Sequence, residues 1–307
     1  ALGFAEAARA CGLPAGALNV IPGGAAAGAH LVSHPGVDKV TFTGSTATGR
    51  VIGEVCGRLL RPVTLELGGK SAAIILDDAD LDVTMRGLRS ASFVNNGQTC
   101  FLSSRILAPR SRYAEIVEAL AALADGLRVG NPLDSATDVG PLVSERQRDR
   151  VLDFVASAAN SGAKLVAGGS IPKDRDRGWF VAPTVFADVD NSDRLAREEV
   201  FGPVLAVIPY VTESDAIALA NESEFGLAGT VWSSDEDRAM EVARALETGT
   251  VGINDYQLDF RAPFGGVKAS GIGRELGPEG LDSFFSLKSI YRTGQPALPH
   301  PTPGMQP

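Results

Sequence analysis

Short apolar, β-branched runs alternate with longer alanine-rich stretches along most of this chain. Short apolar runs bounded by glycine, proline or polar residues are typical of strands, and apolar positions three or four apart are typical of helices. The pattern predicts strands at 17–21, 39–44, 62–67, 72–76, 104–108, 164–169, 204–210, 229–232 and 250–254. It predicts helices at 1–12, 79–95, 113–128, 144–161, 213–221 and 235–247. This alternation indicates an α/β protein.

Glycines and prolines divide the chain. The first three predicted strands are each separated by one helix, which predicts parallel pairing through right-handed crossovers. Gly68 and Gly69 are almost all that separates the strands at 62–67 and 72–76, and we interpret them as a hinge between two domains. The alternating segment 287–292 predicts an exposed edge strand, which tends to find a partner. Five prolines among the last fourteen residues predict a disordered tail at 294–307.

Charge and cysteine content exclude several classes of partner. The net charge of the 307 residues is −9, which disfavours nucleic acid and anionic membranes as partners. No apolar run approaches the ~20 residues of a membrane-spanning helix. Three widely spaced cysteines fit a reducing cytoplasm better than a disulfide framework. The first residues have no signal-peptide pattern and begin in mid-element, so we expect a cytoplasmic protein and a fragment of a longer chain.

Cys100 ends the polar turn "NNGQTC" after the helix predicted at 79–95. Because backbone amides and water can reach such a turn, this thiol is a candidate nucleophile. A free thiol is only slightly ionised at neutral pH, so it needs activation. The dipole of the preceding helix has the wrong direction for this, which leaves backbone amides, Lys70 or a positively charged cofactor. A packed small side chain is the alternative that this stretch alone leaves open.

Two further stretches place polar groups beside glycines. Glu66 lies in an apolar strand just before the two hinge glycines, where a carboxylate is either paired or desolvated with a raised pKa, as a general base requires. The stretch "TFTGSTATGR" at 41–50 predicts a strand, a turn at Gly44 and Ser45, and a helix whose free amides favour a pyrophosphate. A salt-bridged glutamate and an ordinary N-capped turn are the alternatives.

His30 and His34 have the i, i+4 spacing of metal ligands. Neither an HExxH motif nor a third ligand accompanies them. We therefore interpret the pair as a solvated helix face and predict no metal site.

Taken together, these stretches resemble the aldehyde dehydrogenase family. The motifs "FTGSTATG", "VTLELGGKS", "NNGQTC", "EEVFGPVL" and "APFGGVKASGIGRELGPEG" occur in the family's order, and Glu66 precedes Cys100 by 34 residues as in the family. The resemblance covers about residues 1–292. It implies NAD(P)-dependent oxidation of an aldehyde to a carboxylic acid, with NAD as the expected cofactor and NADP as the alternative.

The resemblance also implies residue roles. It makes Cys100 the nucleophile and Glu66 the general base. It assigns to the cofactor Gly24 and Gly28 near the adenine, Phe42, Gly44 and Ser45 at the pyrophosphate turn, and Leu67, Glu199 and Phe201 near the nicotinamide and its ribose. It assigns to the substrate pocket Thr99, Phe101, Asn254 and Phe264.

The family's architecture then gives the expected domains. Residues 1–68 should form a partial Rossmann-like dinucleotide-binding domain and residues 69–270 an α/β catalytic domain. Residues 271–293 should form a return helix and an oligomerisation strand, as in the dimers and tetramers of the family. The family's upstream part, with an oxyanion-hole amide and the adenosine-ribose ligands, has no counterpart here, so we expect the chain alone to be inactive.

Two rivals to aldehyde oxidation follow from the same residues. One is a coenzyme-A-acylating semialdehyde dehydrogenase, in which the thioester has to survive until a thiol attacks, so that a water-activating Glu66 would be counterproductive. The other is a non-catalytic remnant of the fold that has lost affinity for the dinucleotide. The identity of the aldehyde does not follow from these residues.

Overall fold

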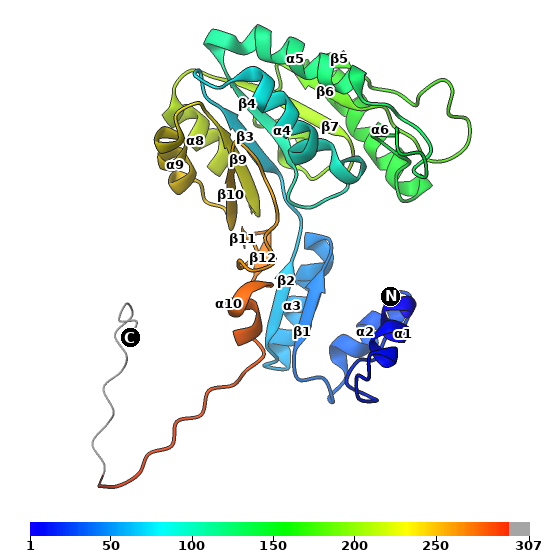
Figure 1. Ribbon diagram of the computed structural model, residues 1–307, viewed down its shortest axis with the longest axis vertical. Helices are drawn as coiled ribbons and strands as arrows, with labels where there is room; N and C mark the ends of the chain where they lie inside the picture. The colour runs from blue at the N-terminus through cyan, green and yellow to red at the C-terminus, as the bar shows by residue number, and fades with distance from the viewer. Residues whose placement is uncertain (295–307) are drawn as a thin grey trace.

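The computed structural model describes residues 1–294, which form two main β-sheets with helices packed on them (Figure 1). The tail predicted at 294–307 lies, except for Gly294, outside the described residues. The strands are β1 Val40–Thr43, β2 Val63–Glu66, β3 Ser71–Ile75, β4 Ser103–Pro109, β5 Lys164–Ala167, β6 Thr184–Ala187, β7 Val204–Tyr210, β8 Phe225–Gly226, β9 Ala228–Trp232, β10 Thr250–Ile253, β11 Val267–Lys268 and β12 Gly271–Ile272. The helices are α1 Leu2–Ala10, α2 Ala25–Ser33, α3 Thr46–Arg58, α4 Leu81–Phe93, α5 Tyr113–Gly126, α6 Glu145–Asn160, α7 Arg194–Arg197, α8 Glu213–Asn221, α9 Glu236–Ala245 and α10 Gly277–Asp282, with 3₁₀ turns η1 Val94–Gly97 and η2 Arg110–Arg112.

The larger sheet has seven strands in the order β10-β9-β3-β4-β7-β6-β5. Every pair in it is parallel except β5 with β6, which is antiparallel. Parallel strands are covered on both faces, so they read as continuous apolar runs in the sequence. In β3, Ala73 and Ile75 face α4 and α5, whereas Ala72 and Ile74 face the layer of α6, α8 and α9. The α/β fold class is therefore confirmed.

The smaller sheet has three strands in the order β1-β2-β12. β1 and β2 are parallel and joined through α3, as the pattern predicts, and Cys56 of α3 packs with Leu65 of β2 in a small core. β12 comes from the far end of the chain and pairs antiparallel with β2, with Gly271 opposite Glu66. The strand beside the candidate base thus comes from the C-terminal part of the chain.

The chain passes from the smaller sheet to the larger one through Leu67, Gly68, Gly69 and Lys70, between β2 and β3 (Figure 1). The strands predicted at 39–44 and 72–76 therefore lie in different sheets. The domain limits at residues 68 and 270 remain a prediction.

Two predicted strands are not formed in the described residues. Residues 17–21 are turn and irregular chain, and residues 287–292 have no regular structure and leave Leu287, Ile290 and Tyr291 almost fully exposed. The strand predicted at 17–21 was wrong, because an apolar run becomes a strand only beside a hydrogen-bonding neighbour, and the described part of the chain supplies none. The strand at 287–292 was expected to pair across subunits, so it remains a prediction. The pattern also missed β6 and the two-residue strands β8, β11 and β12.

Candidate active site

The turn that carries Cys100 is fixed by three consecutive residues with positive φ. Asn95, Asn96 and Gly97 have φ values of 52°, 60° and 73° and end α4 sharply. The side chain of Asn96 accepts a hydrogen bond from Gly140 N and donates one to Pro141 O, which anchors the turn. A Cβ at Gly97 would lie 2.2 Å from the carbonyl carbon of Gly202, so only glycine fits there. This turn sets the start of the segment that leads through Thr99 to Cys100.

Cys100 is half-buried and lies against the segment between the two sheets. A Cβ at Gly69 would lie 2.3 Å from the Cys100 carbonyl oxygen, so this close approach requires glycine. Burial, and then the carboxylates of Glu199 and Glu66, raise the pKa of the Cys100 thiol to about 11. The thiol is therefore close to both predicted acidic residues, and the described residues by themselves keep it protonated at neutral pH.

Glu66 ends β2 with its side chain buried, and neither carboxyl oxygen has a hydrogen-bond partner among the described residues. A Cβ at Gly265 would lie 2.6 Å from Oε1, so that glycine packs directly on the carboxyl group. Burial, and then the like charge of Glu275, raise the pKa of Glu66 to about 8, although Arg274 opposes the shift. Of the two alternatives for this carboxyl group, the structure shows the desolvated one.

Aromatic rings cover one side of the Cys100 segment. The ring of Phe101 stacks on Tyr256 at a centroid distance of 5.0 Å and meets Phe264 edge-on at 6.2 Å. Phe264 is held by paired backbone hydrogen bonds with Glu275. Both pocket residues predicted here, Phe101 and Phe264, thus lie together, and they form an apolar wall beside the thiol.

Glu199 and Phe201 lie on the other side, next to the hinge. Glu199 Oε1 accepts a hydrogen bond of 3.2 Å from Gly69 N, and burial raises the pKa of its carboxyl group. Phe201 is partly exposed, with φ of 57°, and its carbonyl accepts a hydrogen bond from Gln147 Nε2. A small cavity lined by Gly69, Ser92, Gly97, Thr99, Leu102, Ser104, Glu199, Val200, Phe201 and Gly202 joins this side to the Cys100 turn.

The turn between β1 and α3 is the predicted strand-to-helix turn, with a serine N-cap. Ser45 is the N-cap of α3 and its hydroxyl accepts a hydrogen bond from Thr48 N, and the Phe42 ring packs where a Cβ of Gly44 would lie. Leu67 is buried against Gly49 in the same helix, where a larger residue would clash with its side chain. The helix N-terminus is thus held close to the last residues of β2.

The other predicted site residues either have open space around them or already have hydrogen-bond partners. Gly24 is the N-cap of α2 and Gly28 lies within that helix, with open space around both. The side-chain amide of Asn254 is committed to Ser233, accepting from its N–H and donating to its carbonyl. His30 and His34 are exposed, and residues 1–294 contain no group of side chains that could hold a metal ion.

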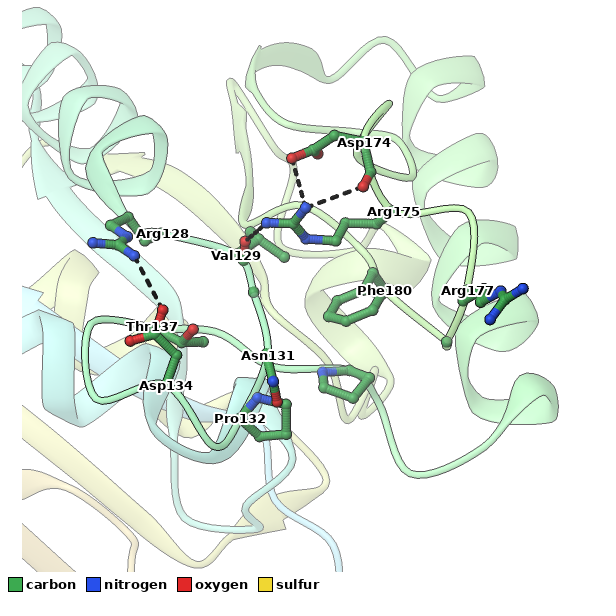
Figure 2. Close-up of a pocket in the computed structure, with 13 residues that line it drawn as sticks. Arg128, Val129, Asn131, Pro132, Asp134, Thr137, Asp174, Arg175, Arg177 and Phe180 are labelled. Carbon is green, nitrogen blue, oxygen red and sulfur yellow. Dashed lines mark hydrogen bonds and ion pairs between the residues drawn. The ribbon is translucent and has the colours of Figure 1, made fainter.

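A wide groove of about 840 Å³ lies on the larger domain, between the loop at 128–141 and the loop at 174–180 (Figure 2). Two ion pairs lie in it, since Arg128 contacts Asp134 and Arg175 contacts Asp174, and Arg175 also donates to Val129 O. None of the predicted site residues lines it. Cys100 and Glu199 instead lie against the segment 67–70 that joins the two sheets.

Comparison with known proteins shows the family of this chain. The model of the aldehyde dehydrogenase family matches residues 1–290. The chain belongs to the aldehyde dehydrogenase family. A geranial dehydrogenase from Castellaniella defragrans is 58% identical over 291 residues, which are 95% of this chain and 60% of that protein. A betaine aldehyde dehydrogenase from Rhizobium etli is 44% identical over 95% of this chain and 60% of its own length.

Solved structures agree. An aldehyde dehydrogenase from Mycobacterium tuberculosis, complexed with NAD+, superimposes with a TM-score of 0.94 at 50% identity, over 96% of this chain and 62% of that one. An aldehyde dehydrogenase from Bacillus cereus, also in an NAD+ complex, superimposes with a TM-score of 0.91 at 43% identity. The chain thus spans about 60% of the length of the family members that it matches.

The structure adds residues to which the sequence interpretation gave no role. Glu275 acts on Glu66 through its charge, and Tyr256 completes the aromatic wall. Glu275 stands in the quoted motif "GRELGPEG", so the family resemblance contained a signal for it. Tyr256 lies in the stretch "DYQLDFRA", where the charged residues gave no signal for it. Asp259 and Arg261 of this stretch pair with each other on the surface.

Proposed function

We propose that this chain is the catalytic part of an aldehyde dehydrogenase that oxidises an aldehyde to a carboxylic acid with NAD, or with NADP. One observation carries the proposal: Glu66 at the end of β2 and Cys100 in the turn before β4 lie close enough for the Glu66 charge to raise the pKa of the thiol, while the carboxyl group itself is desolvated. A nucleophile and a base are thereby placed beside one apolar wall.

The residues of the chain fit a dinucleotide. The amides at the start of α3 behind Ser45 and the close approach at Gly44 suit a pyrophosphate, and the half-buried carboxylate of Glu199 suits a ribose hydroxyl. Phe42, Leu67, Phe201, Gly24 and Gly28 are the further residues that we assign to this molecule. When bound, the oxidised dinucleotide supplies a positive charge and an acceptor for hydride.

The chemistry proceeds on Cys100. The positive charge of a bound oxidised dinucleotide would lower the pKa of the Cys100 thiol, so that its proton passes to solvent. The thiolate then attacks the aldehyde carbon and forms a carbon–sulfur bond, and backbone N–H groups, including that of Cys100, stabilise the oxyanion of the thiohemiacetal. Loss of hydride from that carbon restores the carbonyl group as a thioester. Glu66 then takes a proton from a water molecule, the hydroxide attacks the thioester, and Cys100 leaves as the carboxylic acid forms.

The apolar wall shapes the substrate side of the proposal. Phe101 and Phe264, with Tyr256, present ring faces and edges next to the thiol, and Thr99 adds a small polar side chain. We assign Asn254 to the same pocket. Its side chain is fixed by two hydrogen bonds to the backbone of Ser233.

We also propose a homo-oligomer, either a dimer or a tetramer, in the cytoplasm. The exposed apolar side chains of Phe284, Phe285, Leu287 and Ile290 support self-association through this segment. The free cysteines Cys11, Cys56 and Cys100 fit a reducing compartment. No helix within residues 1–294 is both long and apolar enough to cross a bilayer.

The test uses the extended protein, by which we mean this chain preceded by an upstream region that brings it to the length of its relatives. A panel of aldehydes is offered with NAD and with NADP, and formation of the reduced cofactor is followed by absorbance. We expect reduction with at least one aldehyde, together with release of the free acid. Reduction that requires added coenzyme A would favour the acylating alternative, and no reduction with any aldehyde would contradict the proposal.

A further inference from the structure

Ser270 is a fully buried serine between β11 and β12 that the proposed chemistry does not use. Its hydroxyl makes two hydrogen bonds, because it accepts one of 3.0 Å from Gly226 N and donates one of 2.7 Å to Gly68 O. Its carbonyl oxygen accepts a further hydrogen bond of 2.9 Å from Leu67 N. Ser270 thus joins three parts of the chain that are far apart in sequence: the C-terminal part, β8 and the segment between the two main sheets.

The hydrogen bond to Gly68 O fixes the orientation of one peptide group. The Gly68 carbonyl and the Gly69 N–H belong to the same planar trans peptide unit, so they point in opposite directions. At its other end this unit donates the Gly69 N–H to Glu199 Oε1 at 3.2 Å. The Ser270 hydroxyl and the Glu199 carboxylate therefore hold the two ends of one peptide plane.

Two glycines flank this peptide group, so little in the segment itself holds its orientation. Rotation of the peptide plane changes ψ of Gly68 and φ of Gly69, and glycine adopts the new angles easily because it has no Cβ. A Cβ at Gly68 would lie 2.7 Å from Glu199 Oε2, and a Cβ at Gly69 would lie 2.3 Å from the carbonyl oxygen of residue 100. Since the segment passes so close to the site that it has no side chains here, hydrogen bonds from other parts of the chain have to fix the peptide.

We propose that Ser270 is a positioning residue for the cofactor, whose hydroxyl holds the Gly68–Gly69 peptide in the orientation that presents its N–H to Glu199. The carboxylate placed in this way accepts a hydrogen bond from a ribose hydroxyl of the dinucleotide. The role rests on the proposed function, because Glu199 is taken there as a contact of the dinucleotide. Ser270 itself contacts neither the cofactor nor the aldehyde in this role, and it transfers no proton.

The packing around Ser270 allows a substitution that removes only the hydroxyl. A Cβ at Gly266 would lie 2.4 Å from the Ser270 Cβ, so the backbone of Gly266 lies directly on this side chain. Ser270→Ala keeps the Cβ and this contact. It leaves Gly226 N without its acceptor and Gly68 O without the hydroxyl that binds it.

Thr184 in β6 provides a matched control. Its hydroxyl is also fully buried, accepts a hydrogen bond of 2.9 Å from the N–H of Gly169 and donates one of 2.7 Å to Ala182 O. Neither bond involves a residue that we assign to the site. Thr184→Val therefore removes the same two kinds of hydrogen bond, with the shape of the side chain kept, in a strand next to the β5 edge of the larger sheet.

The first experiment needs no cofactor. Hydrogen exchange of glycine amides is followed by NMR in the 307-residue chain, isotope-labelled on its glycines. In Ser270→Ala the amide of Gly226 should exchange faster, because it has lost its acceptor. The amide of Gly69 should also exchange at least ~10-fold faster, because the released peptide turns away from Glu199. In Thr184→Val the amide of Gly169 should exchange faster instead, and that of Gly69 should keep the parent rate.

The second experiment measures steady-state kinetics in the extended protein. In Ser270→Ala, KM for NAD should rise roughly tenfold, as for the loss of a hydrogen bond to a charged group, with little change in kcat. Thr184→Val should leave KM for NAD unchanged, even where both variants lower Tm to the same extent. Ser270→Cys keeps the shape with a weaker donor, so its KM should lie between those of the parent and Ser270→Ala. It also takes the place of Ser270→Ala in both experiments if that variant does not fold.

A double variant separates positioning from packing. In a background of Glu199→Ala, the substitution Ser270→Ala should change neither the exchange of the Gly69 amide nor KM for NAD, because the carboxylate that the peptide holds is gone. An effect of Ser270 that acted only through the stability of the fold would persist in this background.

The outcomes distinguish the role of Ser270 from the proposed function. A Gly69 amide that keeps the parent exchange rate in Ser270→Ala, while that of Gly226 exchanges faster, would overturn the role of Ser270. An unchanged KM for NAD in the folded variant, or an equal rise in Thr184→Val, would overturn it as well. A parent that reduces neither cofactor with any aldehyde would overturn the proposed function instead, whereas exchange in the cofactor-free chain would still show whether Ser270 fixes the Gly68–Gly69 peptide.

Discussion

Replacement of Glu66 by glutamine tests whether Cys100 acts in hydride transfer and Glu66 acts in hydrolysis of the thioester, as proposed. Glutamine keeps the size of the side chain but cannot take a proton from water. In the extended protein we expect hydride transfer to persist for one turnover, because Cys100 is untouched, while hydrolysis of the thioester slows by ~10²–10⁴-fold, the usual effect of a positioned base. The variant should therefore accumulate an acylated Cys100.

The raised pKa of Glu66 determines how the rate of thioester hydrolysis depends on pH. With a pKa of about 8 in place of 4.5, about a tenth of the carboxyl groups are ionised at pH 7 and about a hundredth at pH 6. Only the ionised form is a base, so hydrolysis in the parent should slow about tenfold for each pH unit below 7 and level off above about pH 9. The Glu66→Gln variant should lack this pH dependence. The ratio of the hydrolysis rate in the parent to that in the variant should therefore decrease as the pH falls.

Stopped-flow absorbance of NADH and mass spectrometry of Cys100 provide the assay. A burst of NADH near one per active site, followed by slow turnover, is the expected record for Glu66→Gln. Glu275→Gln is a matched control: it removes the like charge that raises the pKa of Glu66, so the pH profile should move to lower pH with the burst unchanged. A slow burst that small thiols do not rescue would show that Glu66 activates the thiol instead, and turnover at the parent rate would remove Glu66 from the mechanism.

Three other substitutions test neighbouring parts of the structure. Cys100→Ala should abolish both the burst and turnover in the extended protein, and residual NADH formation near the parent rate would exclude Cys100 as the nucleophile. Gly69→Ala should lower kcat/KM by ~100-fold, because a Cβ 2.3 Å from the Cys100 carbonyl oxygen displaces the nucleophile, whereas Gly57→Ala, with open space around it, should not. Phe154→Ala, in the core between α6 and the larger sheet, should cost ~3–5 kcal/mol of unfolding free energy in urea titrations of the 307-residue chain, and a loss under ~1 kcal/mol would contradict the packing described for α6.

The sequence predicted those elements whose pattern is local. The run "AAIIL" became β3 because both faces of a parallel strand are buried, and α6 and α9 began at Ser144 and Asp235, whose side chains cap them. The run at 17–21 failed because strand formation depends on a neighbour that a local pattern does not contain. Periodicity thus reports burial, but it does not report pairing.

The candidate site divides in the same way. Cys100 and Glu66 stood out because their residue types conflict with their surroundings in the sequence. Tyr256 and Glu275 did not, because their importance comes from contacts across the fold: one ring stacks on Phe101, and one charge acts on a carboxyl group some two hundred residues away. Lys70 was considered only as one possible activator of the Cys100 thiol, and its lack of a hydrogen-bond partner among the described residues is visible only in three dimensions.

The pairing of β12 with β2 has a consequence for the order in which the molecule is built. When a ribosome has made residue 260 of this chain, every strand of the seven-stranded sheet exists, and so do Cys100 and Glu66. The residues that close over the Glu66 carboxyl group, Gly265, Gly271 and Glu275, do not yet exist. Until they arrive, the cover of the two glycines and the charge of Glu275 are missing, so the pKa of the Glu66 carboxyl group should be lower than in the complete chain. Contacts of such long sequence separation form late in folding, so a nascent or prematurely ended chain has Cys100 and Glu66 but lacks the residues that enclose the Glu66 carboxyl group.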